Sequence, residues 1–290
     1  MSEAPAVFDL ARDVVAVGGP ESGSYLQGQL SQDVLGIPDG GSAWSWLLAP
    51  SGKVDALVRV TRLSGEEWLL DTDAGWGEAV LTRLNRFKLR TKVELSPSPL
   101  QVVGLRSPRW EPPAGAVAVL SPPWPGVEGA DVVCPRQVAA GLAPSPAALY
   151  EPDRVAAGIP RMGAELDERT IPGETGLVAI TASFTKGCYT GQELVARVDS
   201  RGGNVPRRLR ILRFAGIAGI AGSAGEAGTV AAGDDLVGPD GRAAGTVTSV
   251  AESARHGRVG LGYVKRGFDL TDRLETSPGG VPVEQVELKL

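Results

Sequence analysis

Short alternations of hydrophobic and polar residues fill the first third of the chain and predict a sheet. The runs that resemble strands cover residues 13–18, 44–48, 54–63, 68–71, 91–95 and 100–105. The run at 44–48 has the period of two that is typical of a half-buried strand. Two stretches instead repeat at helical spacing, one around Tyr25 and Leu30, the other around Val80 and Leu84. Strands interrupted by helices in this order predict an α+β fold with the helices on one face of a sheet.

The character of the chain changes twice after this region. Residues 107–128 hold prolines, two tryptophans and little periodicity, and we expect them to form a surface excursion. The later runs that resemble strands cover residues 208–214, 243–250, 258–264 and 281–290, which predicts a small all-β barrel or sandwich. The Ala- and Gly-rich tract at 215–233 is expected to be a long hairpin loop between two of these strands. We therefore divide the chain into a region of residues 1–205 and a β-barrel domain of residues 206–290.

Composition is that of an ordinary globular protein. Hydrophobic residues make up 42% and charged residues 22%, and the length of 290 residues favours two or three domains. The chain has 29 basic and 34 acidic residues, and this net charge of −5 gives no reason to expect nucleic acid as a partner. No apolar run approaches the ~20 residues that span a bilayer, and residues 1–5 do not resemble a signal peptide. We expect a cytoplasmic protein with no membrane partner.

Cysteine and histidine are scarce, which excludes several kinds of site. The chain has two cysteines, Cys134 and Cys188, and one histidine, His256. These residues cannot form a disulfide framework, a zinc site of several histidines, or an iron–sulfur cluster held by four thiolates. No stably bound metal is therefore expected. His256 lies in a polar turn without an evident orienting partner, so we do not expect it to be catalytic.

The chemically distinctive stretch of the chain is Lys186-Gly187-Cys188-Tyr189-Thr190-Gly191-Gln192-Glu193. Its two glycines allow a tight turn or the close approach of another backbone. Lys186 precedes Cys188 by two residues, and a nearby cation favours the reactive thiolate form of a cysteine. The alternative is a structural turn in which Cys188 is a small core residue. Spacing alone leaves both interpretations open.

This stretch matches the K-G-C-Y-x-G-Q-E signature of the YgfZ family, and two other segments support the resemblance. Residues 26–34 resemble the family's N-terminal L-Q-G-Q-L-(T/S)-x-D-V stretch, and residues 87–93 resemble its F-x-x-R-x-K-V helix exit. The YgfZ family is similar to the glycine-cleavage T protein, an aminomethyltransferase that binds tetrahydrofolate. The resemblance implies a three-lobed fold with a central opening, in which residues 1–205 form two interleaved α+β lobes that bind folate.

The resemblance also implies a function. It suggests that the chain binds tetrahydrofolate or a related folate and acts as an accessory protein in the assembly or repair of iron–sulfur cluster proteins. Its partners would then be the folate and iron–sulfur client or assembly proteins. Cys188 would be the functional thiol, and Lys186 would activate it.

The resemblance further implies folate contacts, which we transfer residue by residue. Glu174 aligns with the glutamate that contacts the pterin in the T protein, and a carboxylate can accept hydrogen bonds from an aminopyrimidine edge. Arg90 matches the helix-exit motif and is a candidate for a polar contact near the opening, although a basic residue there also complements a helix end. Tyr189 and Gln192, in the signature stretch, are the remaining folate-binding candidates.

Two departures from the T protein argue against aminomethyl transfer. The turn at residues 51–57 is one residue shorter than its T-protein counterpart and offers a single acid, Asp55, followed by Ala56. Residues 154–158 carry alanine where the T protein commonly has glutamate. We therefore expect an accessory role more than catalysis. The alternatives are a folate-dependent aminomethyltransferase or demethylase that uses Asp55, and a non-catalytic interaction module with a structural cysteine.

Overall fold

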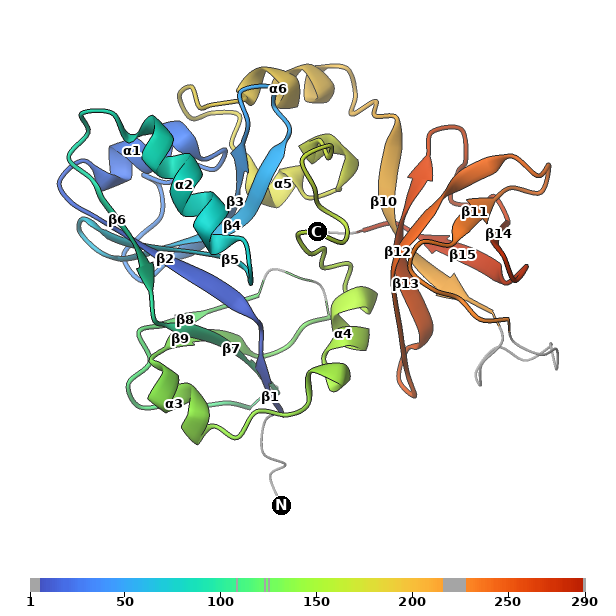
Figure 1. Cartoon of the computed structure of the whole chain (residues 1–290), viewed down its shortest axis with the longest axis horizontal. Coiled ribbons are helices and arrows are strands. Elements are labelled where there is room, and N and C mark those ends of the chain that lie inside the picture. Colours follow the sequence, from blue (N-terminus) through green and yellow to red (C-terminus); the bar gives the residue numbers. More distant parts are fainter. Residues whose placement is uncertain (1–5, 108, 123, 125, 216–227, 289–290) are drawn as a thin grey trace.

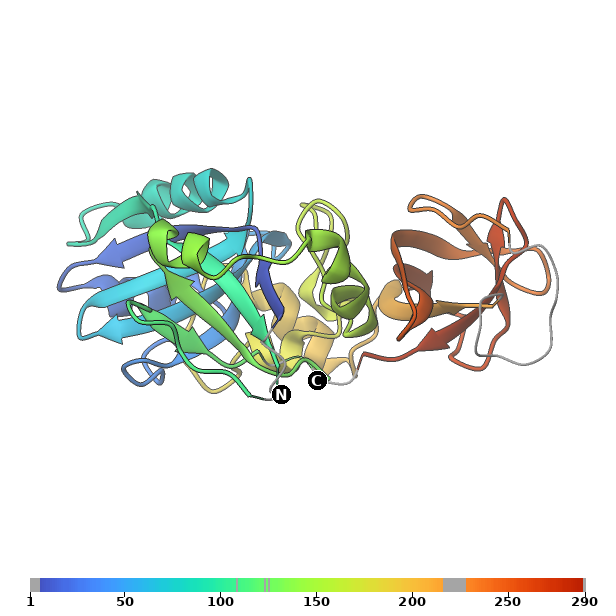
Figure 2. The same ribbon diagram turned by 90° about the horizontal axis from the view of Figure 1, so that it is seen from below.

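Two sheets lie one above the other at one end of the molecule, and a central helical segment separates them from a closed barrel at the other end (Figure 1). The computed structural model describes residues 6–107, 109–122, 124, 126–215 and 228–288. Viewed from below, the central segment around α4 (Glu151–Ala156) separates the sheets from the barrel (Figure 2). The expected α+β class, with a three-lobed arrangement and a C-terminal barrel, is confirmed.

A five-stranded antiparallel sheet forms the first lobe, in the order β3-β4-β5-β2-β6. Its strands are β2 (Arg12–Gly18), β3 (Ser42–Leu48), β4 (Val54–Ser64), β5 (Glu67–Asp73) and β6 (Glu94–Ser98). The helices α1 (Ser22–Gln29) and α2 (Gly77–Lys88) pack on one face through apolar residues such as Leu26 and Leu84. Residues 159–195 cover the other face. That segment contains α5 (Val178–Thr181) and leads into α6 (Gln192–Ser200).

The strand β3 is buried on both faces, so the expectation of a half-buried strand at 44–48 is wrong. Trp46 and Leu48 pack against the 159–195 segment, whereas Leu47 packs on the side of α1. Ser45, which precedes Trp46, is fully buried, and its hydroxyl oxygen accepts a hydrogen bond from the backbone N–H of Gln32 at 3.0 Å. Ser45 is therefore polar because it makes a buried hydrogen bond and not because it faces solvent. The alternation of the sequence does not separate these two cases.

A four-stranded antiparallel sheet forms the second lobe, in the order β1-β7-β9-β8. Its elements are β1 (Ala6–Asp9), β7 (Gln101–Arg106), β8 (Ala118–Leu120), β9 (Ala130–Cys134) and the helix α3 (Arg136–Gly141). The expectation that 107–128 is a surface excursion is wrong for part of that range. Leu120 is buried in the sheet, and buried Trp124 packs edge-on against Trp44 at 5.5 Å. A three-residue strand among prolines is too short to show a period.

The third lobe is a closed barrel in the order β10-β13-β12-β11-β14-β15. Its strands are β10 (Arg207–Phe214), β11 (Asp235–Val237), β12 (Ala243–Ser253), β13 (Gly257–Lys265), β14 (Leu274–Ser277) and β15 (Pro282–Val286). Most of the tract expected to be a loop, residues 216–227, lies outside the described residues, as do 1–5 and 289–290. The domain boundary at 205/206 stays a prediction.

The central segment connects the sheets to the barrel. It begins with a single turn, η1 (Ala147–Leu149), and continues into α4. A second turn, η2 (Pro172–Glu174), lies beside α6. Buried Arg154 of α4 donates a hydrogen bond to the hydroxyl of Ser249 on β12 at 3.0 Å, and that hydroxyl donates to Glu165. A buried polar network therefore fixes the barrel against this segment.

A chain of buried charges joins the two sheets. Arg59 on β4 is 1% exposed and donates to Asp71 on β5 at 2.9 Å and to Asp131 on β9 at 2.6 Å. Arg106 on β7 contacts the other oxygen of Asp131 at 2.7 Å, and Arg12 on β2 pairs with Asp71. Burial alone would raise the pKa of Asp71, but Arg59 and Arg12 hold it below its usual range. Each charge is therefore compensated by a neighbour in the adjacent strand or sheet.

Replacing Arg59 should destabilise the protein strongly. We expect Arg59→Met to lower the free energy of unfolding by ~3–5 kcal/mol, because it leaves two buried carboxylates without their shared cation. The matched control is Arg169→Met, which removes a cation from an exposed pair with Glu168 at 4.0 Å and should cost less than ~1 kcal/mol. Urea denaturation of both variants measures the difference. Equal losses would show that the Arg59 network does not stabilise the contact between the sheets.

Candidate functional site

The signature stretch, residues 186–193, forms a turn between α5 and α6 that exposes one side chain able to react. Cys188 is exposed, whereas the other cysteine, Cys134, is fully buried on β9. Burial raises the pKa of the Cys134 thiol. Gly187, before the exposed cysteine, has open space where a Cβ would lie, so neighbouring atoms do not crowd this part of the turn. The structure therefore presents the Cys188 thiol to solvent and keeps Cys134 inside the protein.

Lys186 anchors the start of this turn to the end of α1. Its ammonium donates hydrogen bonds to the backbone carbonyl oxygens of Gln27, Leu30 and Gln32, the last two at 2.6 and 3.0 Å. A cation at the carbonyl end of a helix is a favourable arrangement. Burial lowers the pKa of Lys186 to about 8, and nearby Asp33 partly opposes that shift. These contacts hold the turn against α1, while activation of the thiol by Lys186 stays a prediction.

A contact between two glycines fixes the other end of the turn. Gly191 has a φ of +81°, and a Cβ at this residue would lie 2.5 Å from the carbonyl oxygen of Ala49. Gly52, in the β3–β4 hairpin, has a φ of +82°, and a Cβ there would lie 2.4 Å from Cβ of Leu194. Real Cβ atoms do not approach other atoms so closely, so only glycine fits at either position. The hairpin turn and the start of α6 therefore depend on each other for their positions.

Tyr189 and Gln192 hold the middle of the turn. Tyr189 is buried in the core on the inner face of the five-stranded sheet, and burial raises its pKa. Its backbone N–H donates to Oε1 of Gln192 at 3.1 Å, and Nζ of Lys186 lies 5.0 Å from the centre of its ring. Both side chains thus have structural partners within the motif. Their assignment as folate contacts stays a prediction.

Glu174 lies in η2 as a buried carboxylate with one cationic partner. The side chain is 5% exposed, and its Oε2 accepts a hydrogen bond from Nε of Arg207 at 3.1 Å. Burial raises the pKa of Glu174, while Arg207 acts in the opposite direction. The guanidinium of Arg207 in turn lies 4.0 Å from the centre of the Tyr263 ring. A carboxylate has about four acceptor positions, so this one has capacity for further donors such as an aminopyrimidine edge.

The local sequence explains why η2 holds its shape. Pro172 at the first helical position needs no hydrogen-bond partner for its nitrogen. The hydroxyl of Thr175 donates to the carbonyl oxygen of Pro172 at 2.7 Å and accepts from the backbone N–H of Leu177 at 3.1 Å. A Cβ on Gly173 would collide with Val198 of α6, so glycine permits the close packing there. The turn carrying Glu174 is therefore rigid.

Asp55 lines a cavity on the side of α2. The cavity has a volume of about 610 Å³, and its polar lining includes Asp55, Arg83, Arg86 and Glu168. Arg83 Nε donates to Asp55 at 3.0 Å, while the same guanidinium contacts the carbonyl oxygen of Leu48. Burial raises the pKa of Asp55, and Arg83 opposes that shift. The volume is in the range of small-ligand sites, ~300–1,000 Å³.

The predicted site residues other than Arg90 lie in two separate places. Val54, the residue before Asp55, donates its backbone N–H to the carbonyl oxygen of Thr170, which lies shortly before Glu174 in the chain. Cys188 instead precedes α6, whereas Glu174 packs beside the C-terminal part of that helix. A helix of this length spans ~13 Å. The structure thus links the segments of Asp55 and Glu174 and places the thiol at the other end of α6.

Arg90 lies beyond the end of α2 and is exposed. In Figure 1 this helix and the loop that leads to β6 lie at the end of the molecule away from the barrel. Glu174, by contrast, contacts Arg207 at the start of the first barrel strand. Arg90 and Glu174 therefore do not lie on adjoining elements. The role of Arg90 as a folate contact stays a prediction.

Sequence reasoning missed three residues that complete these contacts. Arg207 pairs with Glu174, Tyr263 supports Arg207, and Arg83 pairs with Asp55. Helical spacing predicts which residues of α2 share a face, and this was a weak signal for the position of Arg83. Arg207 and Tyr263 come from barrel strands, and the sequence does not show that these strands reach η2.

His256 has a partner that local sequence could not reveal. Its Nε2 lies 2.7 Å from Oδ1 of Asp153 on α4, and Arg255 contacts the same carboxylate at 3.9 Å. The expectation that His256 lacks an orienting partner is therefore wrong, because the partner is 103 residues away in the chain. The pair joins the β12–β13 turn to α4, close to the buried network of Arg154.

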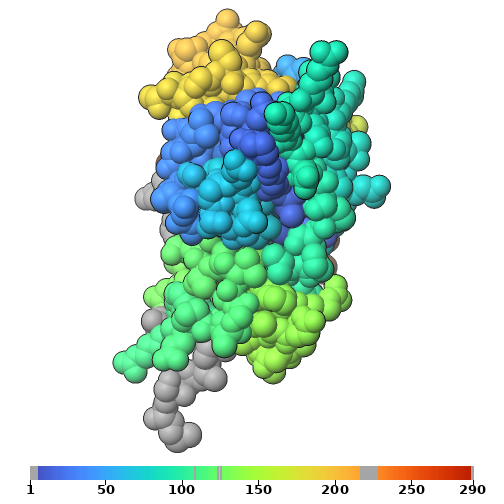
Figure 3. Space-filling view, turned by 90° about the vertical axis from the view of Figure 1, so that its left-hand side faces the viewer, coloured from blue at the N-terminus to red at the C-terminus, as the bar shows by residue number. Residues whose placement is uncertain are grey.

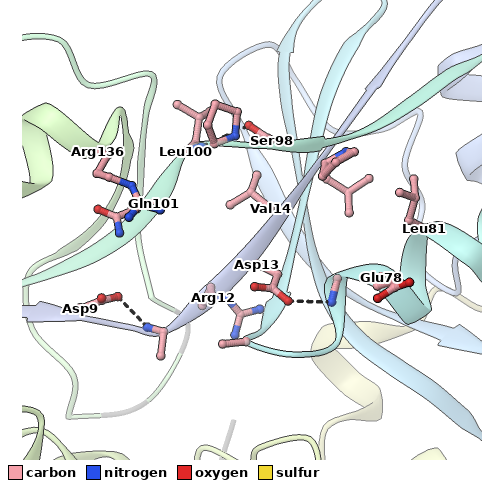
Figure 4. Close-up of a pocket in the computed structure, with 16 residues that line it drawn as sticks. Asp9, Arg12, Asp13, Val14, Glu78, Leu81, Ser98, Leu100, Gln101 and Arg136 are labelled. Carbon is pink, nitrogen blue, oxygen red and sulfur yellow. Dashed lines mark hydrogen bonds between the residues drawn. The ribbon is translucent and has the colours of Figure 1, made fainter.

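A second cavity lies where β2 meets the ends of α2 and α3 (Figure 4). It has a volume of about 680 Å³, and its charged lining residues are Asp9, Arg12, Asp13, Glu78 and Arg136. Asp13 is already occupied, because it accepts the backbone N–H groups of residues 75 and 77 at the start of α2. None of the predicted site residues lines this cavity.

The described residues contain no group of three or more His, Cys, Asp or Glu side chains placed to hold a metal ion. In the same part of the chain, no helix has the length and apolar character needed to cross a membrane.

No family model matches the chain. Sequence comparison finds relatives, and two of them carry different names. The iron-sulfur cluster assembly factor IBA57 homolog, mitochondrial, of Pyricularia oryzae is 28% identical over 207 residues, which cover 66% of this chain and 53% of that protein. The tRNA-modifying protein YgfZ of Vibrio vulnificus is 28% identical over 210 residues, which cover 66% of this chain and 64% of that protein. The matches thus span between about half and two thirds of these relatives.

Structure comparison identifies the fold. The glycine cleavage system aminomethyltransferase T of Bartonella henselae superposes with a TM-score of 0.80 over 98% of this chain and 86% of that chain, at 18% sequence identity. The resemblance to the YgfZ family and the T-protein-like fold are therefore both confirmed.

The buried position of Lys186 should make stability depend on pH. The unfolded chain holds the Lys186 proton up to about pH 10.5 and the folded chain up to about pH 8, so the free energy of unfolding should rise between these values. Lys186→Met should remove that part of the rise, whereas Lys53→Met, which replaces an exposed lysine, should retain it. Urea denaturation at a series of pH values measures both. An unchanged rise in Lys186→Met would contradict the assignment.

Proposed function

We propose that this relative of the YgfZ proteins, with the fold of a T protein, is a tetrahydrofolate-binding accessory protein in the assembly or repair of iron–sulfur cluster proteins. The observation that carries the proposal is the exposed Cys188 on a turn anchored at both ends. The neighbouring side chains Lys186, Tyr189 and Gln192 have structural partners, whereas Cys188 is exposed on the turn that precedes α6. Such an arrangement favours a thiol that acts on another molecule.

The names of the relatives favour iron–sulfur proteins as that other molecule. One relative is named an iron–sulfur cluster assembly factor, which supports a similar role for this chain. The thiolate of Cys188 could serve as a transient ligand of a cluster iron or contact a client protein. A single cysteine supplies one ligand of the four that a cluster commonly has, so any cluster would have to be shared with a partner. We therefore infer a role in transfer or repair of a cluster and not in its storage.

Folate binding is supported by the fold and by the chemistry of Glu174. The pterin ring presents N–H donors on its aminopyrimidine edge, and a buried carboxylate accepts such donors well. Arg207 keeps the carboxylate oriented from one side, which leaves its other acceptor positions for the ring. The residues present thus fit a folate, with Glu174 as the group that would orient it. Tetrahydrofolate would supply a carrier of one-carbon units.

Asp55 and its cavity support a second candidate, a folate-dependent aminomethyltransferase or demethylase. The raised pKa of Asp55 and its position in a ligand-sized cavity are features of catalytic carboxylates. However, Arg83 already pairs with this carboxylate, and the turn offers no second acid. We therefore rank this reaction below the accessory role. The third candidate, a module with a structural cysteine, agrees less well with the exposure of Cys188.

Tetrahydrofolate should bind the wild-type protein and bind Glu174→Gln ~10–100-fold more weakly, because the variant loses a charge-assisted hydrogen bond. Glutamine can still accept from Arg207, so the fold should be retained. Glu193→Gln is the control, since Glu193 is an exposed acid at the start of α6. Isothermal titration calorimetry gives the three affinities. Equal binding by Glu174→Gln and the wild type would remove Glu174 from the site, and no binding by the wild type would reject a folate protein.

In cells that lack the homologous gene, this chain should restore the activity of a labile iron–sulfur enzyme, and Cys188→Ala should not. Cys134→Ala removes the buried thiol and should still restore activity, provided that immunoblots show equal amounts of protein. Full restoration by Cys188→Ala would contradict a functional thiol. Turnover of a methylamine-bearing donor with tetrahydrofolate that is lost in Asp55→Asn would instead favour the transferase.

A further inference from the structure

The turn after α2 has a leucine where the backbone strongly favours glycine. Leu89 has a φ of 47° and a ψ of −119°, and the backbone N–H of Thr91 donates to the carbonyl oxygen of Lys88 at 3.0 Å. These values describe a type II′ turn with Leu89 at its first central position, which is normally occupied by glycine. An L-residue with a bulky side chain is strained in this conformation.

Leu89 gains no packing within the protein in exchange for this strain. Its side chain is 89% exposed, the highest fraction among the large exposed hydrophobic residues of the described part of the chain. The backbone that follows is nevertheless firmly held. Lys92 donates its N–H to a carboxylate oxygen of Glu21 at 2.6 Å and accepts from the Glu21 N–H at 3.3 Å, and Val93 is buried. A rigid turn therefore presents an apolar side chain to solvent.

Four cations flank this leucine in the sequence. The residues from 86 to 92 include Arg86, Lys88, Arg90 and Lys92 in a chain whose net charge is −5. Arg86 and Lys88 lie in the last turn of α2, where they complement the helix end. The helix end does not explain the other two cations, because they follow the turn. None of the four takes part in an ion pair between described residues, unlike Arg83 one helical turn earlier.

We propose that residues 86–92 form a docking surface for an acidic protein segment that covers Leu89 with an apolar residue. The positive charge of the surface is complementary to such a segment, and a leucine on a rigid turn loses little backbone freedom when a partner covers it. The surface forms the upper right edge of the face in Figure 3, on the elements coloured teal. Arg86 also lines the cavity of Asp55, but residues 88–92 do not, and this end of α2 is separate from the turn of Cys188 and from η2. The inference therefore rests on the geometry of this turn and not on the function proposed above.

A protein partner agrees with the surface better than nucleic acid does. Phosphate groups would explain the cations but not the leucine, because single-stranded nucleic acid is commonly held by stacking on aromatic rings. The aromatic residue here, Phe87, is covered on one face by the guanidinium of Arg83 at 3.9 Å from the ring centre. The aliphatic side chain is therefore the group that a partner would cover.

The test uses the full chain labelled with nitrogen-15 and a synthetic peptide in which glutamates flank a central pair of leucines. We expect the peptide to shift the amide signals of residues 86–92, with an affinity that falls as salt is added. Leu89→Gly should bind about tenfold more weakly while its melting temperature stays the same or rises, since glycine adopts this turn without strain. If Leu89 had only a structural role, Leu89→Gly would instead bind the peptide normally and melt at a lower temperature.

Charge reversal separates the docking surface from general attraction. Arg86→Glu combined with Arg90→Glu should abolish peptide binding, whereas Arg197→Glu combined with Arg201→Glu, two exposed cations at α6, should not. A peptide with lysines in place of glutamates should fail to bind. No binding of the acidic peptide to the wild type, or equal binding to Leu89→Gly, would overturn the proposal. It would also be overturned if duplex RNA competed with the peptide and bound Leu89→Gly normally, or if residues 86–92 proved to hold two copies of this chain together.

Discussion

The contact between the two N-terminal sheets depends on a buried chain of alternating charges. Arg59 bridges Asp71 in its own sheet and Asp131 in the other, and Arg106 completes the pairing of Asp131. A buried charge is costly unless it is paired and hydrogen-bonded, so these side chains restrict how the sheets can be placed. Apolar residues alone would fill the space without defining one arrangement. The position of the central segment follows, because it packs against the face formed by β3 and β4.

Much of the fold could be predicted from the sequence where one period covers a whole element. The strands β2, β4 and β5 and the helices α1 and α2 were expected within a few residues of their bounds, because their apolar faces follow regular spacing. Short elements escaped detection, as β8 and β14 show, since three or four residues do not define a period. The burial of β3 on both faces also escaped, because Ser45 is polar yet hydrogen-bonded inside the protein.

The candidate site was predictable where a motif is contiguous and not where it is assembled from distant segments. The exposed Cys188 lies in eight adjacent residues, and the sequence alone identified the stretch. The partners of these residues come from elsewhere: Lys186 reaches the end of α1, and Glu174 meets Arg207. No local pattern encodes such pairs, because tertiary packing brings them together. The same reasoning applies to His256 of the barrel, whose partner Asp153 lies on α4 of the central segment.

Because Gly52 packs against Gly191, the β3–β4 hairpin helps to determine the position of the Cys188 thiol. Because the two backbones touch, the length of the hairpin turn determines where α6 begins and hence where Cys188 is held. One more residue at the tip would push the two segments apart and displace the thiol without altering any residue of the signature stretch. The short hairpin of this chain therefore contributes to the position of the cysteine.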